Sequence, residues 1–125
     1  MNADNLGAAG PLLRVLVLED EPMIAAMLIE WLTELQCDPV GPATSTDAAL
    51  AIIAAEALDC AILDVSLKGG DSFPAAEALQ AKNVPFAFAT GREPDDLTSR
   101  FAGAVVLLKP FDFSAVSALI GQWSR

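Results

Sequence analysis

The sequence predicts an α/β fold in which a doubly wound, five-stranded parallel sheet is covered by helices on both faces. Short apolar runs rich in β-forming residues occur near 14–18, 60–63, 84–89 and 104–108, and they alternate with segments of helical character. These runs are apolar at consecutive positions, as expected of parallel strands that are buried on both faces. Over 125 residues, this alternation indicates one domain with a single core.

The expected strands differ in strength. Val15-Leu16-Val17-Leu18 and Val105-Val106-Leu107-Leu108 would each bury both of their faces. A weaker run around Pro39-Val40-Gly41-Pro42 contains two prolines, and proline is tolerated mainly on edge strands because it has no backbone N–H. The flavodoxin-like strand order 2-1-3-4-5 places this run at an edge of the sheet, and the connections between strands should be right-handed.

Helices are expected between the strands and after the last one, over residues 22–35, 47–57, 72–81, 94–100 and 112–123. The first begins at Pro22, because proline is favoured in the first turn of a helix. Its apolar residues follow at spacings of three and four, which gives a stripe that faces the core. They are Ile24, Met27, Leu28, Trp31, Leu32 and Leu35. Thr46 and Asp112 are candidate N-terminal caps for the second and the last helix.

The N-terminal segment differs from the rest of the chain. Residues 1–12 contain no basic segment followed by an apolar one, so they do not resemble a signal peptide. Their Asn, Gly and Ala residues predict a flexible extension that precedes a domain over residues 13–125. No apolar stretch is long and uninterrupted enough to span a membrane.

Charge and composition exclude several functions. The net charge is −10 and there is no histidine, so direct binding to nucleic acid or to an anionic membrane is not expected. Catalytic triads and metal sites that depend on histidine are also excluded. The two cysteines, Cys37 and Cys60, are too few for a disulfide framework. We expect reduced thiols in a cytoplasmic protein.

Polar side chains stand at the ends of four of the expected strands. Glu19 and Asp20 follow the first strand, Asp64 ends the third, and Thr90 and Lys109 follow the fourth and the fifth. In doubly wound sheets, ligands bind outside the carboxyl ends of the strands, at the point where the strand order reverses. A carboxylate at the tip of a buried strand is costly unless something there requires it. The pattern therefore predicts one site built from four loops.

Three carboxylates at one site repel each other and favour a bound cation. Two unit charges about 4 Å apart interact by roughly 4 kcal/mol at an effective dielectric constant of about 20. Oxygen ligands from few protein groups suit Mg²⁺, which keeps several waters, whereas the calcium-loop pattern with its terminal Glu is missing. The alternative is that the acids at 19–21 only begin a helix, that Thr90 is a turn residue and that Lys109 is a solvated strand end.

A hydroxyl and an ammonium that face a metal-bound carboxylate suit phosphoryl transfer. A metal ion and Lys109 would neutralise the phosphoryl oxygens while the carboxylate attacks in line. An aspartyl phosphate is a known kind of covalent intermediate. Phosphatases of the haloacid dehalogenase class also use such an aspartate, but they need a second Asp two residues later, where this chain has Ser66.

Four segments resemble the receiver domain of two-component response regulators, and they occur in the order of that family. The resemblance extends from about residue 13 to the C-terminus. The segments are Val15-Leu16-Val17-Leu18-Glu19-Asp20-Glu21-Pro22, Ala61-Ile62-Leu63-Asp64, Phe88-Ala89-Thr90-Gly91 and Leu108-Lys109-Pro110-Phe111.

This resemblance implies a magnesium-dependent phosphoacceptor. Asp64 would take a phosphoryl group from a histidine kinase or a histidine phosphotransferase in a two-component system or phosphorelay. Asp20, Asp64 and the backbone carbonyl of Ser66 would bind Mg²⁺ directly, and Glu19 would contribute through a water molecule. The domain would then switch a surface that binds a downstream protein, which the sequence does not identify.

The resemblance also assigns roles at the other strand ends. Thr90 would hydrogen-bond to the phosphoryl group, Lys109 would pair with it, and the Lys109–Pro110 peptide bond would be cis, as essentially only bonds to proline are. Such a protein is a signalling domain and not an enzyme, apart from its own phosphotransfer and autodephosphorylation.

Residues 86–91 also resemble the Phe-Ala-Thr-Gly signature of an alphaproteobacterial receiver subgroup, which is often single-domain and tied to general stress signalling. The chain departs from the family at two places. Arg92-Glu93 follow the glycine where the subgroup usually has an aromatic residue, and Val106 stands where many receivers carry a Tyr or Phe that turns inward on activation. The alternative is a pseudo-receiver, a protein-interaction module that needs no phosphate.

Overall fold

The computed structural model describes residues 12–91, 100–101 and 103–124. Within them, five parallel strands form one sheet in the order β2-β1-β3-β6-β7, which confirms the expected order. The strand that contains the two prolines, β2, lies at an edge, as predicted. The strands are β1 (Arg14–Leu18), β2 (Asp38–Ala43), β3 (Cys60–Asp64), β6 (Phe86–Thr90) and β7 (Val105–Leu108).

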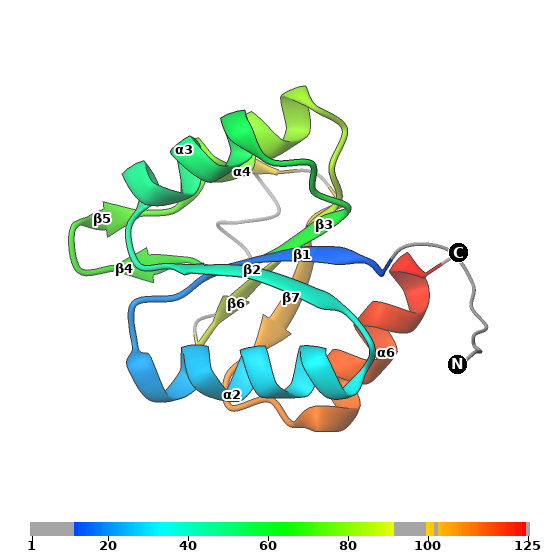
Figure 1. The fold of residues 1–125 in the computed structure, drawn as a ribbon. Helices are drawn as coiled ribbons and strands as arrows, with labels where there is room; N and C mark the ends of the chain where they lie inside the picture. Colours follow the sequence, from blue (N-terminus) through cyan, green and yellow to red (C-terminus); the bar gives the residue numbers. More distant parts are fainter. Residues whose placement is uncertain (1–11, 92–99, 102, 125) are drawn as a thin grey trace.

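Helices cover both faces of this sheet. In Figure 1, α3 and α4 lie on one face, and α2 and α6 lie on the other. The helix that we expected over 94–100 lies outside the described residues except for Arg100. The helices are α2 (Pro22–Glu34), α3 (Thr46–Ala55), α4 (Phe73–Ala81) and α6 (Phe113–Trp123).

Of the two predicted N-terminal caps, the structure confirms one and shows that the other is wrong. Asp112 caps α6 as expected, because its side chain accepts the backbone N–H of Ala115. The expected cap of α3, Thr46, is wrong: Ser45 has the extended backbone of a cap residue and accepts the N–H of Ala48 at 3.1 Å. Thr46 is the first residue of the helix, and its hydroxyl does not cap it because Ser45 does.

The sheet divides the core into two layers. Successive side chains of a strand point to opposite faces, so the consecutive apolar residues of β1, β3 and β6 fill both layers. The expectation that the apolar run of β7 would bury both of its faces is wrong: β7 is an edge strand, and Val105 and Leu108 are 37% and 54% exposed. The layer under α3 and α4 contains Leu16, Leu18, Leu63 and Phe88. The layer against α2 and α6 contains Val15, Val17, Ile62 and Ala87.

A short hairpin that we did not predict follows β3. Its strands, β4 (Ser66–Leu67) and β5 (Gly70–Asp71), pair antiparallel as a separate two-stranded sheet. The two-residue turn between them is Lys68-Gly69. Because a glycine in a turn is a hairpin signal, the consecutive glycines of this segment could have indicated it.

Both cysteines lie in the core layer against α2 and α6. Cys37 and Cys60 are buried free thiols, and burial raises the pKa of Cys60 to about 12. Among the described residues, no helix has the length and apolar character needed to cross a membrane.

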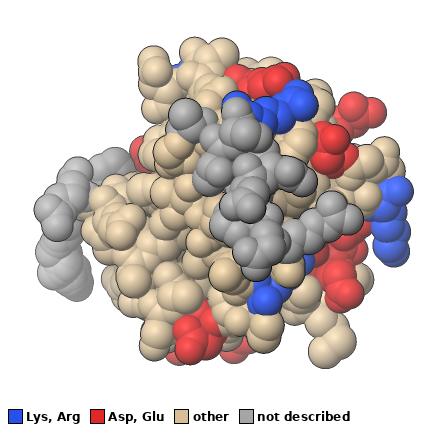
Figure 2. All heavy atoms as spheres, turned by 180° about the vertical axis from the view of Figure 1, so that it is seen from behind, with Lys and Arg blue, Asp and Glu red and all other residues tan. Residues whose placement is uncertain are grey.

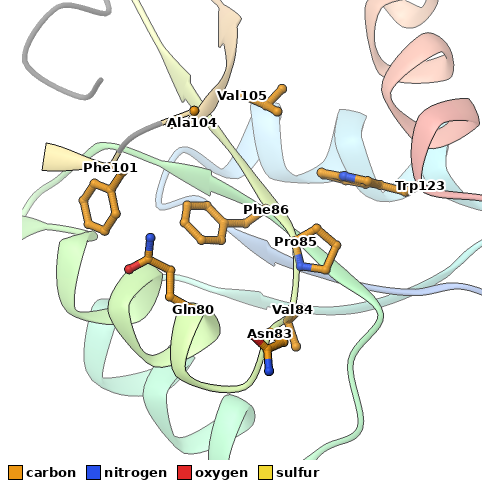
Figure 3. A pocket seen from close by; sticks show the side chains of 10 residues that line it. Gln80, Asn83, Val84, Pro85, Phe86, Phe101, Ala104, Val105 and Trp123 are labelled. Atoms are coloured by element: carbon orange, nitrogen blue, oxygen red, sulfur yellow. The ribbon is translucent and has the colours of Figure 1, made fainter. Parts of the chain in front are cut away.

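A hollow of about 550 Å³ lies at the start of β6 and β7, where the rings of Phe86 and Phe101 and the amide of Gln80 line it (Figure 3). Phe86 begins β6, whereas Thr90 ends it. The hollow is therefore at the opposite end of the sheet from the polar side chains that the sequence singled out.

Candidate functional site

Three carboxylates meet at the carboxyl ends of β1 and β3. These strands are neighbours, and their register pairs Leu18 with Leu63. Glu19 and Asp64 directly follow the paired residues, so the register brings them together. Glu19, Asp20 and Asp64 each offer a carboxylate oxygen, and these oxygens lie within 4.8 Å of one another. The structure therefore assembles the acidic cluster that the sequence predicted.

The hydroxyl and the ammonium come from the next two strands. Thr90 ends β6, is 5% exposed, and its backbone oxygen accepts the N–H of Lys109 at 2.8 Å. The Nζ atom of Lys109 lies 3.3 Å from Oδ1 of Asp64 and 3.4 Å from Oε1 of Glu19. One ammonium thus contacts two of the three carboxylates, and four strand ends contribute to a single site.

Two further positions from the resemblance lie beside this cluster. Ser66 begins the β4–β5 hairpin two residues after Asp64 and is exposed. The Lys109–Pro110 peptide bond is cis, as the resemblance implied. The role of the Ser66 carbonyl as a metal ligand stays a prediction.

Two backbone donors that sequence reasoning missed orient the carboxylates. The N–H of Lys68, in the hairpin turn, donates to Oδ2 of Asp20 at 2.7 Å. The N–H of Glu21 donates to Oε2 of Glu19 at 3.1 Å. Every residue except proline has a backbone N–H, so no sequence signal marks these two. Such outer contacts fix the rotamers of groups that bind metals.

Burial dominates the electrostatics of Glu19. It is 1% exposed, and this burial raises its pKa from the ordinary 4.5 to about 7. The hydrogen bond from the Glu21 N–H lowers this pKa, the neighbouring Asp64 raises it, and the ammonium of Lys109 lowers it. In the metal-free site, the Glu19 carboxyl therefore keeps its proton to a higher pH than an exposed carboxyl does.

The cluster fits a small divalent cation. All of its donors are carboxylate oxygens, the ligands that Mg²⁺ prefers, and Mg²⁺ holds them at about 2.1 Å. Direct ligands on one ion are then at most about 4.2 Å apart. The carboxylate oxygens of this site lie within 4.8 Å of one another, which is close enough for one ion to bind them directly or through water after small side-chain rotations. Three carboxylates and one ammonium also leave an excess of negative charge for a cation to neutralise.

The surface around the domain is acidic as well. On the face shown in Figure 2, acidic side chains form several patches, and a broad area has no charged side chain. With a net charge of −10, the protein repels anions at long range. Binding of a phosphoryl group therefore depends on positive charge inside the site.

The raised pKa of Glu19 predicts how the stability of the metal-free protein depends on pH. Because the folded state holds this proton more tightly than the unfolded chain, its stabilising effect is complete below about pH 4.5 and is lost as the pH rises through about 7. Glu19→Gln removes this titration. In thermal unfolding with a chelator, the melting temperature of the wild type should fall relative to that of Glu19→Gln between about pH 5 and about pH 8.

Glu30→Gln is the matched control, since Glu30 is an exposed acid on α2. Its melting temperature should follow the wild type over the same pH range. A constant difference between the wild type and Glu19→Gln would show that Glu19 titrates at its ordinary pKa.

Comparison with known proteins matches most of this chain to one family. Residues 15–120 match the family model described as the response regulator receiver domain. The chain is 34% identical over 105 residues to the transcriptional regulatory protein PdtaR of Mycobacterium tuberculosis, and this match covers 81% of the chain and 51% of PdtaR. The chain therefore spans about half the length of the regulatory proteins that it matches in this way.

Solved structures resemble the whole fold. The solution structure of SdrG from Sphingomonas melonis Fr1 is 42% identical, with a TM-score of 0.79, and the match covers 94% of this chain and 100% of that one. The BeF3-activated conformation of SdrG, from Pseudomonas melonis Fr1, is 43% identical, with a TM-score of 0.75, and the match covers 90% and 97%. The receiver domain of PhyR from Erythrobacter litoralis is 28% identical, with a TM-score of 0.82, and the match covers 91% of both chains.

Proposed function

Because this chain belongs to the response regulator receiver domain family, we propose that Asp64 accepts a phosphoryl group in a two-component system or phosphorelay. The donor is a phosphohistidine of a histidine kinase or a histidine phosphotransferase. Phosphorylation changes a surface that binds a downstream protein. The observation that carries this proposal is the contact of one lysine, Lys109, with both Asp64 and Glu19 at the ends of the sheet strands.

In the transfer step, a carboxylate oxygen of Asp64 attacks phosphorus in line. The O–P bond forms as the P–N bond to the donor imidazole breaks, and the electron pair of that bond stays on the nitrogen. Lys109 lies 3.3 Å from Asp64, where its ammonium can pair with a phosphoryl oxygen. Thr90, at the end of the neighbouring strand, offers its hydroxyl to another oxygen.

Asp20, Asp64 and the backbone carbonyl of Ser66 would hold Mg²⁺, with Glu19 acting through water. When bound, the ion supplies positive charge to the phosphoryl oxygens. The product carries about −1.5 to −2 additional charge in a site where Lys109 was shared between two carboxylates. Lys109 then shifts toward the new oxygens, and this shift begins the change at the surface.

The biological setting follows from the same resemblance. The Phe-Ala-Thr-Gly segment at 88–91, which resembles the signature of a receiver subgroup tied to general stress signalling, supports a role in stress signalling. The two free thiols support a cytoplasmic location. The protein is then a signalling domain whose only catalysis is its own phosphotransfer and autodephosphorylation.

Labelling with acetyl phosphate tests the proposal. With Mg²⁺, the intact protein should gain the mass of one phosphoryl group, and peptide mapping should place it on Asp64. A chelator should prevent the labelling, because the carboxylates would then repel the donor. Absence of a label at all Mg²⁺ concentrations, or a label on another residue, would count against the proposal.

Beryllium fluoride provides a second test that needs no covalent bond. Trp31 contacts the ring of Phe111, which is two residues after Lys109, with ring centroids 6.5 Å apart. In a Trp123→Phe background, Trp31 is the single tryptophan and reports movement of this segment. Its fluorescence should change in a saturable way only when Mg²⁺ and beryllium fluoride are both present.

A phosphate-independent interaction module is the second candidate. Val106 favours it, since this residue packs against the core layer under α3 and α4 and has no ring that could turn inward. Such a module would bind its protein partner equally well with and without beryllium fluoride. A pull-down under both conditions separates the two functions.

A further inference from the structure

We propose that Thr46 is a positioning residue for the metal site, although it contacts none of the three carboxylates. Its hydroxyl holds the β4–β5 hairpin in the place from which the Lys68 N–H fixes Asp20. This inference rests on the proposed function, because it concerns the affinity of the same site for Mg²⁺.

The hairpin contacts Asp20 directly. The Lys68 N–H donates to Oδ2 of Asp20 at 2.7 Å, a short hydrogen bond to a charged acceptor. Asp20 is only half-buried, so packing alone does not fix its side chain. The bond engages one carboxylate oxygen and leaves the other for a cation. The position of the hairpin turn therefore decides where Asp20 presents its ligand oxygen.

The hairpin is too short to hold this position by itself. It consists of two residue pairs, Ser66 with Asp71 and Leu67 with Gly70, and an isolated two-stranded hairpin is at best marginally stable. Gly70 and Asp71 are both exposed. The hairpin needs anchors in the rest of the domain.

Besides the Ser72 N–H bond to Val65 at its base, the hairpin has an anchor on α3. The Thr46 hydroxyl donates to the backbone oxygen of Asp71 at 2.9 Å, and Asp71 is the residue that pairs with Ser66. Thr46 begins α3, and the cap of that helix, Ser45, fixes its backbone. The hydroxyl therefore connects the hairpin to the first turn of α3.

Leu67 packs against the core layer under α3 and α4, whereas residues 68–71, at the turn of the hairpin, are exposed and depend more on this bond. A hollow of about 410 Å³ separates the first turn of α3 from the hairpin and is lined by Thr46, Asp47, Gly69 and Gly70, among others. Loss of the hydroxyl would therefore allow the hairpin to move. Lys68 and the carbonyl of Ser66 would move with it, and two determinants of the metal site would be displaced together.

Mg²⁺ titrations of three threonine variants, followed by backbone amide shifts, test this role. Thr46→Val keeps the shape of the side chain but removes the hydrogen-bond donor. It should weaken Mg²⁺ binding roughly tenfold, which is the lower end of the loss in metal affinity seen when a residue that orients a metal ligand is removed. Thr46→Ser restores the donor and should bind as the wild type does. Thr33→Val is the matched control, since the Thr33 hydroxyl donates to Ile29 at 2.8 Å on the exposed face of α2.

The outcomes separate this inference from the proposed function. Equal Mg²⁺ affinity of the wild type and Thr46→Val would overturn the positioning role alone, as would a loss that Thr46→Ser does not rescue. A wild type without any saturable response to Mg²⁺ would overturn the proposed function and the positioning role with it. Melting temperatures of Thr46→Val and Thr33→Val should be similar, so that a change in affinity is not a change in folding.

A second pair of variants tests the same connection if Thr46→Val does not fold. Lys68→Pro removes the backbone N–H that reaches Asp20, whereas Lys68→Ala keeps it and removes only the side chain. Both variants lose the ammonium, so their comparison isolates the N–H: Lys68→Pro should bind Mg²⁺ more weakly than Lys68→Ala, by at least the loss seen in Thr46→Val. Equal affinities of the two Lys68 variants would overturn the role of the hairpin.

Discussion

Asp64→Asn should abolish labelling by acetyl phosphate and leave the fold intact. The amide occupies the volume of the carboxylate, but its oxygen is a much weaker nucleophile. Asp64 is 7% exposed and contacts Lys109, so a replacement of the same shape preserves the packing at the end of β3. The label on the intact protein should fall below detection, as intact mass measurement will show, while the circular dichroism spectrum stays that of the wild type.

Asp47→Asn is the matched control, because Asp47 is an exposed acid in the first turn of α3. It removes one carboxylate by the same chemical change and should be labelled as the wild type is. The pKa of Glu19 should also fall in Asp64→Asn, since Asp64 raises it. An Asp64→Asn protein that is labelled to the wild-type extent would show that another group accepts the phosphoryl group.

Phe88→Ala should cause the largest loss of stability among single substitutions in the core. Phe88 is fully buried on β6, and the rings of Phe73, Phe86 and Phe101 surround it at centroid distances of 5.9, 5.4 and 5.3 Å. Truncation of such a side chain costs about 3–5 kcal/mol, because it removes buried apolar surface and leaves a cavity. Domains of this kind are stable by about 5–15 kcal/mol in total.

Urea denaturation measures this loss, with Phe113→Ala as the control. Phe113 is 38% exposed and packs edge-on against Trp31, so its truncation should cost about 1 kcal/mol. Phe88 is also two residues before Thr90, and a disturbed β6 should weaken Mg²⁺ binding at the strand ends. A loss for Phe88→Ala no greater than that for Phe113→Ala would contradict this account of the core.

The sheet and the cluster of site residues were predictable because each leaves a pattern in the sequence. Strands β1 and β3 are buried on both faces and appear as continuous apolar runs. The apolar run of β7 also marked a strand, although β7 lies at an edge of the sheet and two of its residues are exposed. Polar residues at their ends must then meet at one edge of the sheet. Glu19, Asp64 and Lys109 are therefore expected to lie together from the sequence alone.

Other features leave weaker patterns or none. The strands of the β4–β5 hairpin have two residues each, too few for a periodic pattern. Ser45 and Thr46 are both good cap residues, and only the backbone angles show that Ser45 is the cap of α3. The Lys68 N–H on Asp20 cannot be read from side-chain types at all. The pKa of Glu19 depends on the depth of its burial, which also requires coordinates.

Under the proposed function, the contact of one lysine with two carboxylates sets the order in which ligands bind. With Glu19 and Asp64 both ionised, Lys109 offsets only part of their charge, and Asp20 adds a third anion. A phosphoryl donor is itself an anion, so these carboxylates would repel it until a divalent cation is bound. The cation would then bind first and the donor second, and the concentration of free Mg²⁺ would set the fraction of the protein that can accept a phosphoryl group.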